Sequence, residues 1–494
     1  MVSKEILLEF MREQAYNPML DIELAEVFDI QRIEMGEFLS LLDEMEKDGA
    51  VIKTKKKRYA VPERMNLVVG RLQSTQKGFG FIIPDNTDLE DVFVPASDLN
   101  GAMHKDKVIA RLSRKSGKGK RLEGEIIRII ERVNREIVGT FESSRNFGFV
   151  VSDDKRIKYD IYIPKSEVNG AKDGYKVVAE ITRWPEPRRN PEGKVVEVLG
   201  HKDDIGTDII SIIRKYKLPE RFPKKVLAEA DNISDTVSEE EIARRRDLRH
   251  MNIVTIDGAD AKDLDDAISV ERLPNGNYKL GVYIADVTHY VKEGSPLDKE
   301  ALKRATSVYL VDRVIPMLPK KLSNGICSLN PNVERLTMSI FMEIDDKGKV
   351  VGHEIFEGVI KTKERMTYTD VSDILEKEDP ELLKRYDYLV EDFRLMQELA
   401  TILSKRKNRR GSIDFDFPES KIILDEEGKP VEIKKAERRI ANRIIEEFMI
   451  VCNETIAEHM YWLKVPFVYR VHEVPAAEKL SNFNKFIHNF GYHL

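Results

Sequence analysis

The chain of 494 residues is longer than one hydrophobic core usually serves, so we expect three or more domains. With 41% hydrophobic and 34% charged residues and no apolar run of about 18 residues, the sequence excludes global disorder and a membrane-spanning segment. The formal net charge of −6 argues by itself against a nucleic-acid partner. Residues 66–200, however, contain 24 Lys and Arg against 20 Asp and Glu, so this part of the chain is locally basic.

The first residues and the two cysteines bear on the cellular compartment. Met1 to Glu5 lead into an amphipathic pattern and not into a basic stretch followed by an apolar core, so we expect a cytoplasmic protein. Cys327 and Cys452 are far apart in the sequence. Their spacing fits neither a disulfide framework nor a zinc site, so both are expected to be core thiols.

Residues 1–64 are expected to form a winged helix-turn-helix domain. Apolar residues recur at helical spacing in the stretches 6–11, 24–28 and 38–45. The third stretch is followed by Asp48-Gly49, a helix stop, and then by an alternating stretch that suits a two-stranded wing. A small bundle for protein interaction or regulation is the alternative, because this fold binds proteins as well as nucleic acids.

Residues 66–134 and 135–205 are predicted to be two related β-domains. From Leu67 the apolar period changes to two, and the pattern recurs about 70 residues later. Each copy holds a Phe-Gly-Phe string followed by a strand with a further aromatic residue. These strings resemble tandem cold-shock domains, which are five-stranded OB-type barrels that stack bases on aromatic side chains. The basic run 114–121 between the copies is expected to be a solvated linker.

The aromatic residues of each copy are candidates for binding RNA. Strand residues two apart lie on the same face, so each Phe pair can join the aromatic residue of the next strand in one platform. Lys77 and Arg145 flank the platforms and would contact the phosphate backbone. Alternating Phe residues can instead fill a β-core, but duplication with basic flanks favours a binding surface. The predicted platforms are Phe79, Phe81 and Phe93 in the first copy and Phe147, Phe149 and Tyr162 in the second.

Residues 253–270 read as a strand, a carboxylate-rich turn and a second strand. The carboxylates that could converge in this turn are Asp257, Asp263, Asp265 and Asp266. Their mutual repulsion would raise their pKa values unless a cation neutralised them. Oxygen ligands select Mg²⁺, Mn²⁺ or Ca²⁺, and the spacing does not fit the calcium-binding EF-hand loop. A solvated acidic loop is the alternative when the turn is considered alone.

Several strings from about residue 210 onward resemble, in order and spacing, the ribonuclease II/ribonuclease R family of exoribonucleases. They are Thr255-Ile256-Asp257 with Asp263 to Ala267, and the segments 281–291, 304–310, 316–319, 322–331 and 469–473. The two cold-shock domains precede these strings as they do in the family. The winged-helix region makes the chain more similar to the ribonuclease R members than to ribonuclease II.

This resemblance implies the fold and the activity. The expected fold is multidomain α+β, with a winged helix, two OB-type cold-shock barrels and an α+β ribonuclease II-type catalytic domain over residues 206–494. The implied activity is hydrolysis of single-stranded and 3′-tailed structured RNA from the 3′ end to nucleoside 5′-monophosphates, with Mg²⁺ as cofactor. Partners among RNA-decay or ribosome-associated proteins would also fit the family, although no residue identifies them.

The resemblance also implies roles for individual residues. The family's acidic cluster corresponds to the four aspartates, with Asp257 and Asp266 as main metal ligands and Asp265 binding metal or positioning water. Its base-stacking aromatic residue corresponds to Tyr309, which would hold the terminal base by a contact that tolerates any base. Without the resemblance, Tyr309 would be read as a half-buried strand residue. The basic stretch 405–410 either lines the RNA path or is a solvated helix end.

Family members continue past the equivalent of residue 494 with more of the catalytic domain, including an arginine-bearing substrate contact, and with a further OB-type domain. We therefore expect a C-terminally truncated chain that binds single-stranded RNA but hydrolyses it weakly or not at all. A non-catalytic RNA-binding or chaperone fragment is the alternative function.

Overall fold

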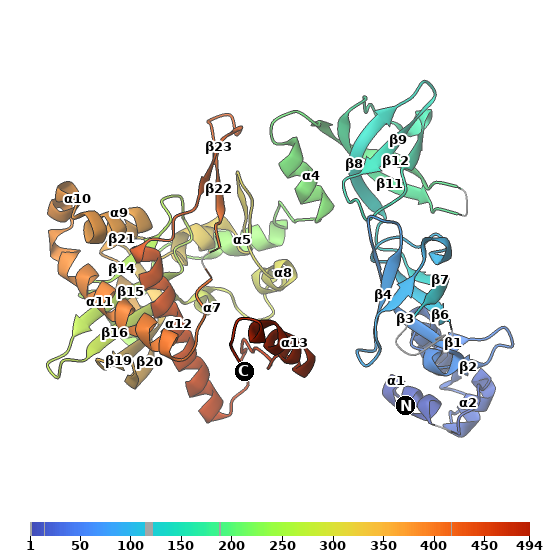
Figure 1. Ribbon diagram of the computed structural model, residues 1–494, viewed down its shortest axis with the longest axis horizontal. Helices are drawn as coiled ribbons and strands as arrows, with labels where there is room; N and C mark the ends of the chain where they lie inside the picture. The colour runs from blue at the N-terminus through green and yellow to red at the C-terminus, as the bar shows by residue number, and fades with distance from the viewer. Residues whose placement is uncertain (1, 14, 114–121, 187–188, 416) are drawn as a thin grey trace. The chain divides into compact units, whose positions relative to one another are not determined.

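The computed structural model describes residues 2–13, 15–113, 122–186, 189–415 and 417–494 (Figure 1). The predicted basic linker 114–121 lies outside these residues. The chain divides into two compact units, Met1–Leu218 with Leu424–Pro430, and Pro219–Ile423 with Val431–Leu494. Among the described residues, no helix is both long enough and apolar enough to cross a lipid bilayer.

The N-terminal segment has the three helices and the hairpin that the sequence predicts. Its elements are α1 (Lys4–Arg12), α2 (Asp21–Val27), α3 (Met35–Lys47), β1 (Ile52–Lys53) and β2 (Tyr59–Ala60). Leu7, Leu24 and Leu42 are fully buried in one cluster, because helical spacing places one apolar stripe of each helix toward the others. The antiparallel pair β1–β2 is the expected wing.

Two five-stranded β-domains follow. The first consists of β3 (Leu67–Ser74), β4 (Gly80–Pro84), β5 (Val92–Val94), β6 (Lys107–Leu112) and β7 (Gly124–Glu131), in the order β5-β4-β3-β6-β7. The second is a closed barrel of β8 (Glu136–Ser143), β9 (Phe147–Ser152), β10 (Ile161–Pro164), β11 (Tyr175–Arg183) and β12 (Glu192–His201). Read from β10, the barrel repeats the strand order of the first domain, in which an isolated bridge between Phe93 and Glu123 links the two edges. This confirms two OB-type domains of one topology.

Helix α4 (Thr207–Lys215) packs against β8, β11 and β12 of the second barrel. Its buried residues are Thr207, Ser211 and Ile213. Because these contacts join the helix to the barrel, the first compact unit continues to Leu218, beyond the boundary predicted at residue 205.

The second unit is built on a seven-stranded sheet in the order β13-β20-β19-β16-β15-β14-β21. Its strands are β13 (Arg246–Asp247), β14 (Val254–Asp257), β15 (Asp266–Arg272), β16 (Tyr278–Ala285), β19 (Glu334–Ile344), β20 (Val350–Lys361) and β21 (Glu364–Thr367). The pairs β13–β20 and β14–β21 are parallel, and the others are antiparallel. The predicted acidic turn connects β14 to β15, which are neighbouring strands of this sheet.

Among the described residues, this unit also contains nine α-helices, several of which contact the sheet. They are α5 (Lys224–Asn232), α6 (Glu239–Arg244), α7 (Val287–Tyr290), α8 (Pro296–Arg304), α9 (Tyr368–Ser372), α10 (Pro380–Arg385), α11 (Asp387–Arg409), α12 (Ile440–Leu463) and α13 (Ala477–His488). The hairpins β17–β18 (Val308–Tyr309 and Val314–Ile315) and β22–β23 (Ser420–Leu424 and Pro430–Lys435) complete the fold. Phe393 of α11 and Phe448 of α12 are fully buried with Ile268 of the sheet in the main core. This mixed arrangement confirms the predicted α+β class. Cys327 and Cys452 are buried free thiols, as expected.

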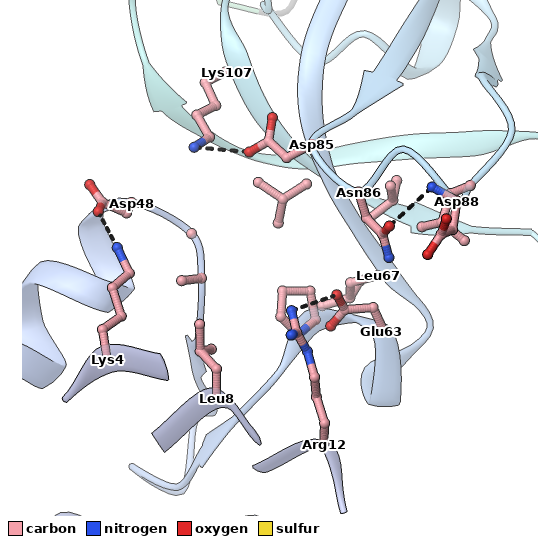
Figure 2. A pocket seen from close by; sticks show the side chains of 16 residues that line it. Lys4, Leu8, Arg12, Asp48, Glu63, Leu67, Asp85, Asn86, Asp88 and Lys107 are labelled. Carbon is pink, nitrogen blue, oxygen red and sulfur yellow. Dashed lines mark hydrogen bonds and ion pairs between the residues drawn. The ribbon is translucent and has the colours of Figure 1, made fainter. Parts of the chain in front are cut away.

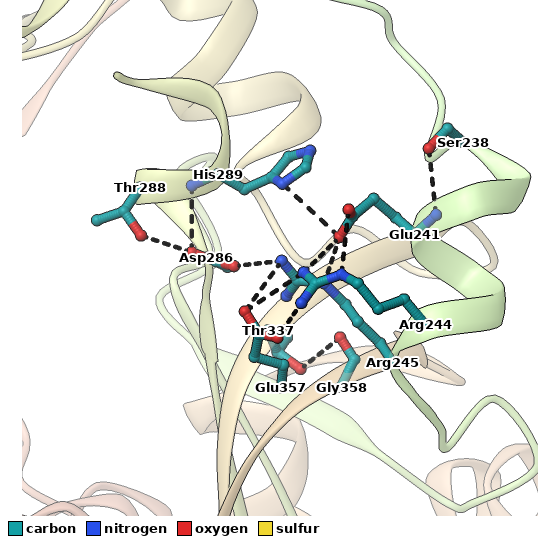
Figure 3. Close-up of polar contacts among 10 residues, drawn as sticks. All are labelled: Ser238, Glu241, Arg244, Arg245, Asp286, Thr288, His289, Thr337, Glu357 and Gly358. Carbon is teal, nitrogen blue, oxygen red and sulfur yellow. Dashed lines mark hydrogen bonds and ion pairs between the residues drawn. The ribbon is translucent and has the colours of Figure 1, made fainter. Parts of the chain in front are cut away.

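A buried ion-pair network lies where the chain enters the sheet (Figure 3). The Arg245 side chain is 1% exposed, and it donates from Nε to Glu241 Oε2 (2.8 Å) and from Nη2 to Asp286 Oδ2 (2.7 Å). Asp286 also caps α7 by accepting from the His289 backbone N–H at 3.2 Å. Asp286 and His289, which occur in a string typical of the family, thus connect α6, the sheet and α7.

Candidate active site

We use the name acidic loop for residues 258–265 together with the flanking Asp257 and Asp266. This loop is held at both ends by the sheet. Asp257 is the last residue of β14 and Asp266 the first of β15. The two strands are paired only at Val254 and Ile268, so no ladder hydrogen bonds join them next to the loop. The Ala285 backbone N–H of β16 donates to the Asp265 carbonyl oxygen at 2.9 Å. The loop is therefore fixed by neighbouring strands while its carboxylates remain available.

Three carboxylates at this loop, those of Asp257, Asp265 and Asp266, have pKa values raised first by burial and then by repulsion from neighbouring carboxylates. Burial, followed by repulsion from Asp265 and Asp257, raises the pKa of Asp266 to about 6. Desolvation by the surrounding protein and the nearby charge of Asp263 raise the pKa of Asp257. Desolvation and the charges of Asp257 and Asp263 likewise raise the pKa of Asp265. Asp263 thus acts electrostatically on Asp257 and Asp265, and Asp257 acts on Asp265 and Asp266, so a bound cation would relieve repulsion at this loop.

The loop is not a ready-made metal cage. Over the ranges that the structure describes, no group of three or more His, Cys, Asp or Glu side chains is arranged to hold a metal ion. Mg²⁺, however, commonly uses one or two carboxylates and completes its coordination with water and substrate phosphate. Mutually repelling carboxylates fit an ion of that kind. The assignment of all four aspartates as ligands remains a prediction.

Tyr309 lies beside the acidic loop. It belongs to the β17–β18 hairpin, its side chain is 65% exposed, and its hydroxyl donates to Asp263 Oδ2 at 2.5 Å. This hydrogen bond, together with desolvation and the Asp263 charge, raises the pKa of Tyr309 to about 12. Its exposure disagrees with a core role and leaves the ring accessible for stacking.

Three residues near the loop were not predicted as site residues. Tyr368 directly follows Thr367, which pairs with Asp257 in the strand register, and burial and the charges of Asp257 and Asp266 raise the pKa of Tyr368 to about 12. Arg365 and Ser328 hydrogen-bond to the loop backbone. Ser328 falls within the family-like string 322–331, which was a usable signal, whereas neither Arg365 nor Tyr368 belongs to a recognisable local pattern.

The predicted aromatic platforms assemble on both barrels. Ring centroids lie 5.4–5.8 Å apart in the first trio and 5.5–5.9 Å apart in the second. Phe81 pairs across the strands with Phe93, and Phe149 pairs with Tyr162. All six side chains are half-buried, while the barrel cores are filled mainly by aliphatic residues. This is the geometry of a surface platform, because core-filling rings would be fully buried. Lys77 and Arg145 are exposed beside the platforms.

The basic stretch 405–410 forms ion pairs within the second unit. Lys407 pairs with Glu447, and Arg410 Nη2 lies 2.7 Å from Glu454 Oε1, both on α12. These two cations therefore join α11 to α12, which favours a structural role for them over contact with RNA.

A polar cavity of about 800 Å³ lies in the N-terminal unit (Figure 2). Several of the charges that line it are paired with each other. The pairs are Lys4–Asp48 at 2.8 Å, Arg12–Glu63 at 4.0 Å and Lys107–Asp85 at 3.0 Å. Balanced pairs of this kind give no net charge to attract a polyanion, so this cavity is not the RNA site.

Comparison with known proteins finds the same modules. Family models match residues 245–493 (RNB domain), 149–223 (cold shock domain) and 70–129 (ribonuclease B OB domain). Ribonuclease R of Thermotoga maritima is 45% identical over 99% of the chain and 69% of its own length. Ribonuclease R of Escherichia coli is 37% identical over 100% of the chain and 60% of its own length.

Solved structures agree with these relatives. The Mycoplasma genitalium RNase R in complex with ribose-methylated single-stranded RNA superimposes with a TM-score of 0.78 at 29% identity, covering 86% of this chain and 66% of that one. The chain thus spans about two thirds or less of the length of most of these relatives. The RNB-domain match over half of the sequence, together with the near full-length similarity to ribonuclease R, shows that this chain belongs to the ribonuclease R family.

Proposed function

We propose that the chain is a magnesium-dependent, hydrolytic 3′-to-5′ exoribonuclease that acts on single-stranded and 3′-tailed structured RNA. The observation that carries this proposal is the acidic loop, where Asp257, Asp265 and Asp266 have raised pKa values and Asp263 is hydrogen-bonded to the exposed Tyr309. The Mycoplasma relative has been solved in complex with single-stranded and with double-stranded RNA, which supports RNA as the ligand.

The residues of the chain divide the work as follows. Asp257 and Asp266 would hold Mg²⁺, which when bound supplies charge to activate water and to stabilise the leaving 3′ oxygen. The Asp265 carboxylate would accept a hydrogen bond from the attacking water and so orient it toward the phosphorus. Tyr309 would stack on the terminal base and hold the scissile phosphodiester over the loop. Hydrolysis then releases one nucleoside 5′-monophosphate and leaves a new 3′ hydroxyl on the shortened RNA.

The barrels would hold the remainder of the strand. Phe81 and Phe149 with their ring neighbours offer stacking surfaces that tolerate any base, and Lys77 and Arg145 add charge for phosphates. A non-catalytic RNA-binding role uses only this part. Membership of the ribonuclease R family favours the enzyme over that alternative.

The test is an RNA-shortening assay on the purified chain. Because we expect this chain to hydrolyse RNA weakly, RNA labelled at the 5′ end should shorten slowly but stepwise from its 3′ end with Mg²⁺ and release mononucleotides, and chelation of Mg²⁺ should stop the reaction. Binding of the RNA without any Mg²⁺-dependent shortening would instead establish the non-catalytic role.

The proposal includes a cytoplasmic location. Both cysteines are buried free thiols, as expected in a reducing compartment. Cell fractionation with an antibody against the chain tests this, and recovery in an extracytoplasmic fraction would contradict it.

A further inference from the structure

The backbone of the acidic loop is held by two side chains whose hydrogen bonds to the loop leave its carboxylates free. We propose that Arg365 and Ser328 are positioning residues that fix the backbone of the acidic loop between Asp257 and Asp266, the two residues proposed to hold the metal. This inference rests on the proposed nuclease function. Neither residue is one of the four predicted aspartates or the proposed base-stacking residue Tyr309.

Arg365 gathers three loop carbonyls on one guanidinium nitrogen. Its Nη2 donates to the carbonyl oxygens of Gly258 (3.3 Å), Ala259 (2.8 Å) and Ala261 (2.7 Å). Because Nη2 carries only two hydrogens, at least one of them is shared between two carbonyls. Contacts of this kind require the carbonyls to converge, so they fix the first half of the loop as a tight turn.

The position of Arg365 follows from strand pairing. It lies on β21, which runs parallel to β14, with Arg365 opposite Thr255 and Thr367 opposite Asp257. Its guanidinium also lowers the pKa of Asp257, against the raising effects of burial and Asp263. Its Nε is buried without a hydrogen-bond partner among the described residues. Since an unsatisfied buried donor is costly, its retention indicates that the three carbonyl contacts determine where the guanidinium sits.

Ser328 holds the second half of the loop on both sides of Asp263. Its fully buried hydroxyl donates to the Lys262 carbonyl oxygen at 2.9 Å and accepts from the Leu264 N–H at 3.1 Å. The neighbouring Leu329 N–H donates to the Leu264 carbonyl oxygen at 2.8 Å. One side chain therefore uses its donor and an acceptor position to fix the residues before and after Asp263.

These contacts oppose the repulsion among the carboxylates. Carboxylates that repel one another tend to spread a loop that lacks ladder hydrogen bonds, and spreading would remove the site before a cation arrives. Arg365 and Ser328 oppose this from the backbone side. Since displacements of about 1 Å can lower catalytic rates about 100-fold, fixing the loop in advance is a direct contribution to activity.

The experiment compares two positioning variants with two matched controls. Ser328→Ala removes the hydroxyl bridge, and its control Ser269→Ala removes another buried serine hydroxyl, one that bonds Tyr283 in the same sheet. Arg365→Gln removes the guanidinium and its three hydrogen bonds to the loop carbonyls. Its control Arg272→Gln removes an arginine of β15 whose partners are Gly276 and Glu398.

Three readouts are needed: Mn²⁺ binding to the RNA-free chain by calorimetry, RNA binding, and Mg²⁺-dependent nucleotide release. Ser328→Ala and Arg365→Gln should weaken Mn²⁺ binding at least about threefold and slow nucleotide release at least about tenfold, with RNA affinity within about twofold of the parent. The two controls should match the parent in all three readouts.

Arg365→Lys separates position from charge. Lysine keeps the positive charge but offers a compact ammonium that does not reproduce the fork of the guanidinium, so Mn²⁺ binding should recover only partly. Full recovery would show a purely electrostatic role and overturn the proposal for Arg365.

The remaining outcomes separate the positioning role from the proposed function. Mn²⁺ binding by Ser328→Ala and Arg365→Gln that equals binding by the controls would overturn the positioning role. If Ser328→Ala does not fold, the Arg365→Lys and Arg365→Gln pair decides alone. A parent chain that binds Mn²⁺ but releases no nucleotides would contradict the proposed function only, because the isotherms still test the loop. A parent that binds no Mn²⁺ would overturn the positioning proposal itself.

Discussion

The aromatic platforms and the acidic loop are assembled in opposite ways. Each platform comes from one short segment, in which Phe81 and Phe93, or Phe149 and Tyr162, are direct neighbours in the strand register. The acidic loop depends on segments far apart in sequence, since Tyr309, Ser328 and Arg365 reach it from a hairpin, a turn and a distant strand.

The two regions also differ in what their side chains do to one another. Half-buried aromatic rings at centroid separations near 5.5 Å attract each other, so a platform is stable before RNA arrives. Carboxylates repel, so the loop needs support from other residues until a cation binds. The binding surface therefore follows from local strand geometry, whereas the proposed reaction centre requires the completed tertiary fold.

Removing one charge from the loop should separate the two regions most strongly. Asp265→Asn, an isosteric change, should abolish Mg²⁺-dependent nucleotide release while RNA binding stays nearly unchanged, because the platforms are untouched. Steady-state release assays and binding curves on one preparation measure both. Retention of more than about a tenth of the parent's turnover, a loss under about 1.4 kcal/mol, would contradict the assignment of Asp265.

Asp260→Asn is the matched control for that variant. Asp260 belongs to the same loop but is exposed and outside the predicted cluster. Its replacement should leave turnover within about threefold of the parent, since exposed charges contribute little. An equal loss in both variants would mean that total loop charge matters and that no individual aspartate has a defined role.

The pH dependence of the loop should be the next largest effect. With the pKa of Asp266 raised to about 6, protons compete with Mg²⁺ below that pH, and the Mg²⁺ concentration for half-maximal release should rise about tenfold per pH unit. RNA binding by the platforms should not share this dependence. Mg²⁺ titrations at pH 7, 6 and 5 measure it, and a half-maximal concentration that stays constant over this range would contradict the raised pKa.

The same pKa shift has a consequence for stability. The folded state holds the Asp266 proton more tightly than the unfolded state, so without metal the free energy of unfolding should decrease as pH rises from about 4 to about 6, and should then stay level with respect to this group. Asp266→Asn should remove that decrease, and added Mg²⁺ should offset it near pH 7. Thermal midpoints measured across this range test both statements.

Tyr309 links the two regions, because its ring would bind a base while its hydroxyl bonds Asp263. Tyr309→Ala should weaken the hold on the terminal nucleotide by about 1–3 kcal/mol and lengthen the shortest end product. Tyr309→Phe should keep the end product short, because the ring remains, and should affect only the orientation of Asp263. Gel analysis of the shortest end products distinguishes the two variants. Identical product ladders for the parent and both variants would show that Tyr309 does not hold the terminal base.

The same contrast explains what could be predicted from sequence. Period-two spacing was enough to place the six platform residues, because the strand geometry that aligns them is local. The aspartates could be proposed as a cluster because they lie within ten residues, Asp257 to Asp266, and their assignment as a metal site stays a prediction. Arg365 and Tyr368 could not be proposed, because their proximity to the loop arises from the parallel pairing of β21 with β14 and from helix α9 that follows it. The packing of α4 on the second barrel could not be predicted, because it depends on tertiary contacts that no turn signal reveals.

The smallest expected effects distinguish the rings of a platform from its charged flank. Phe81→Ala should reduce affinity for single-stranded RNA by about 1 kcal/mol, near the low end for one base stack, because five other rings remain. The salt dependence of binding should not change, since no phosphate contact is lost. Lys77→Gln should do the reverse. It should lower affinity only slightly but reduce the slope of log K against log salt concentration by about 0.7, the value for one phosphate contact on a single strand. Titrations of both variants at several salt concentrations measure the two quantities. A changed slope for Phe81→Ala, or an unchanged slope for Lys77→Gln, would show that rings and charges do not act independently on this surface.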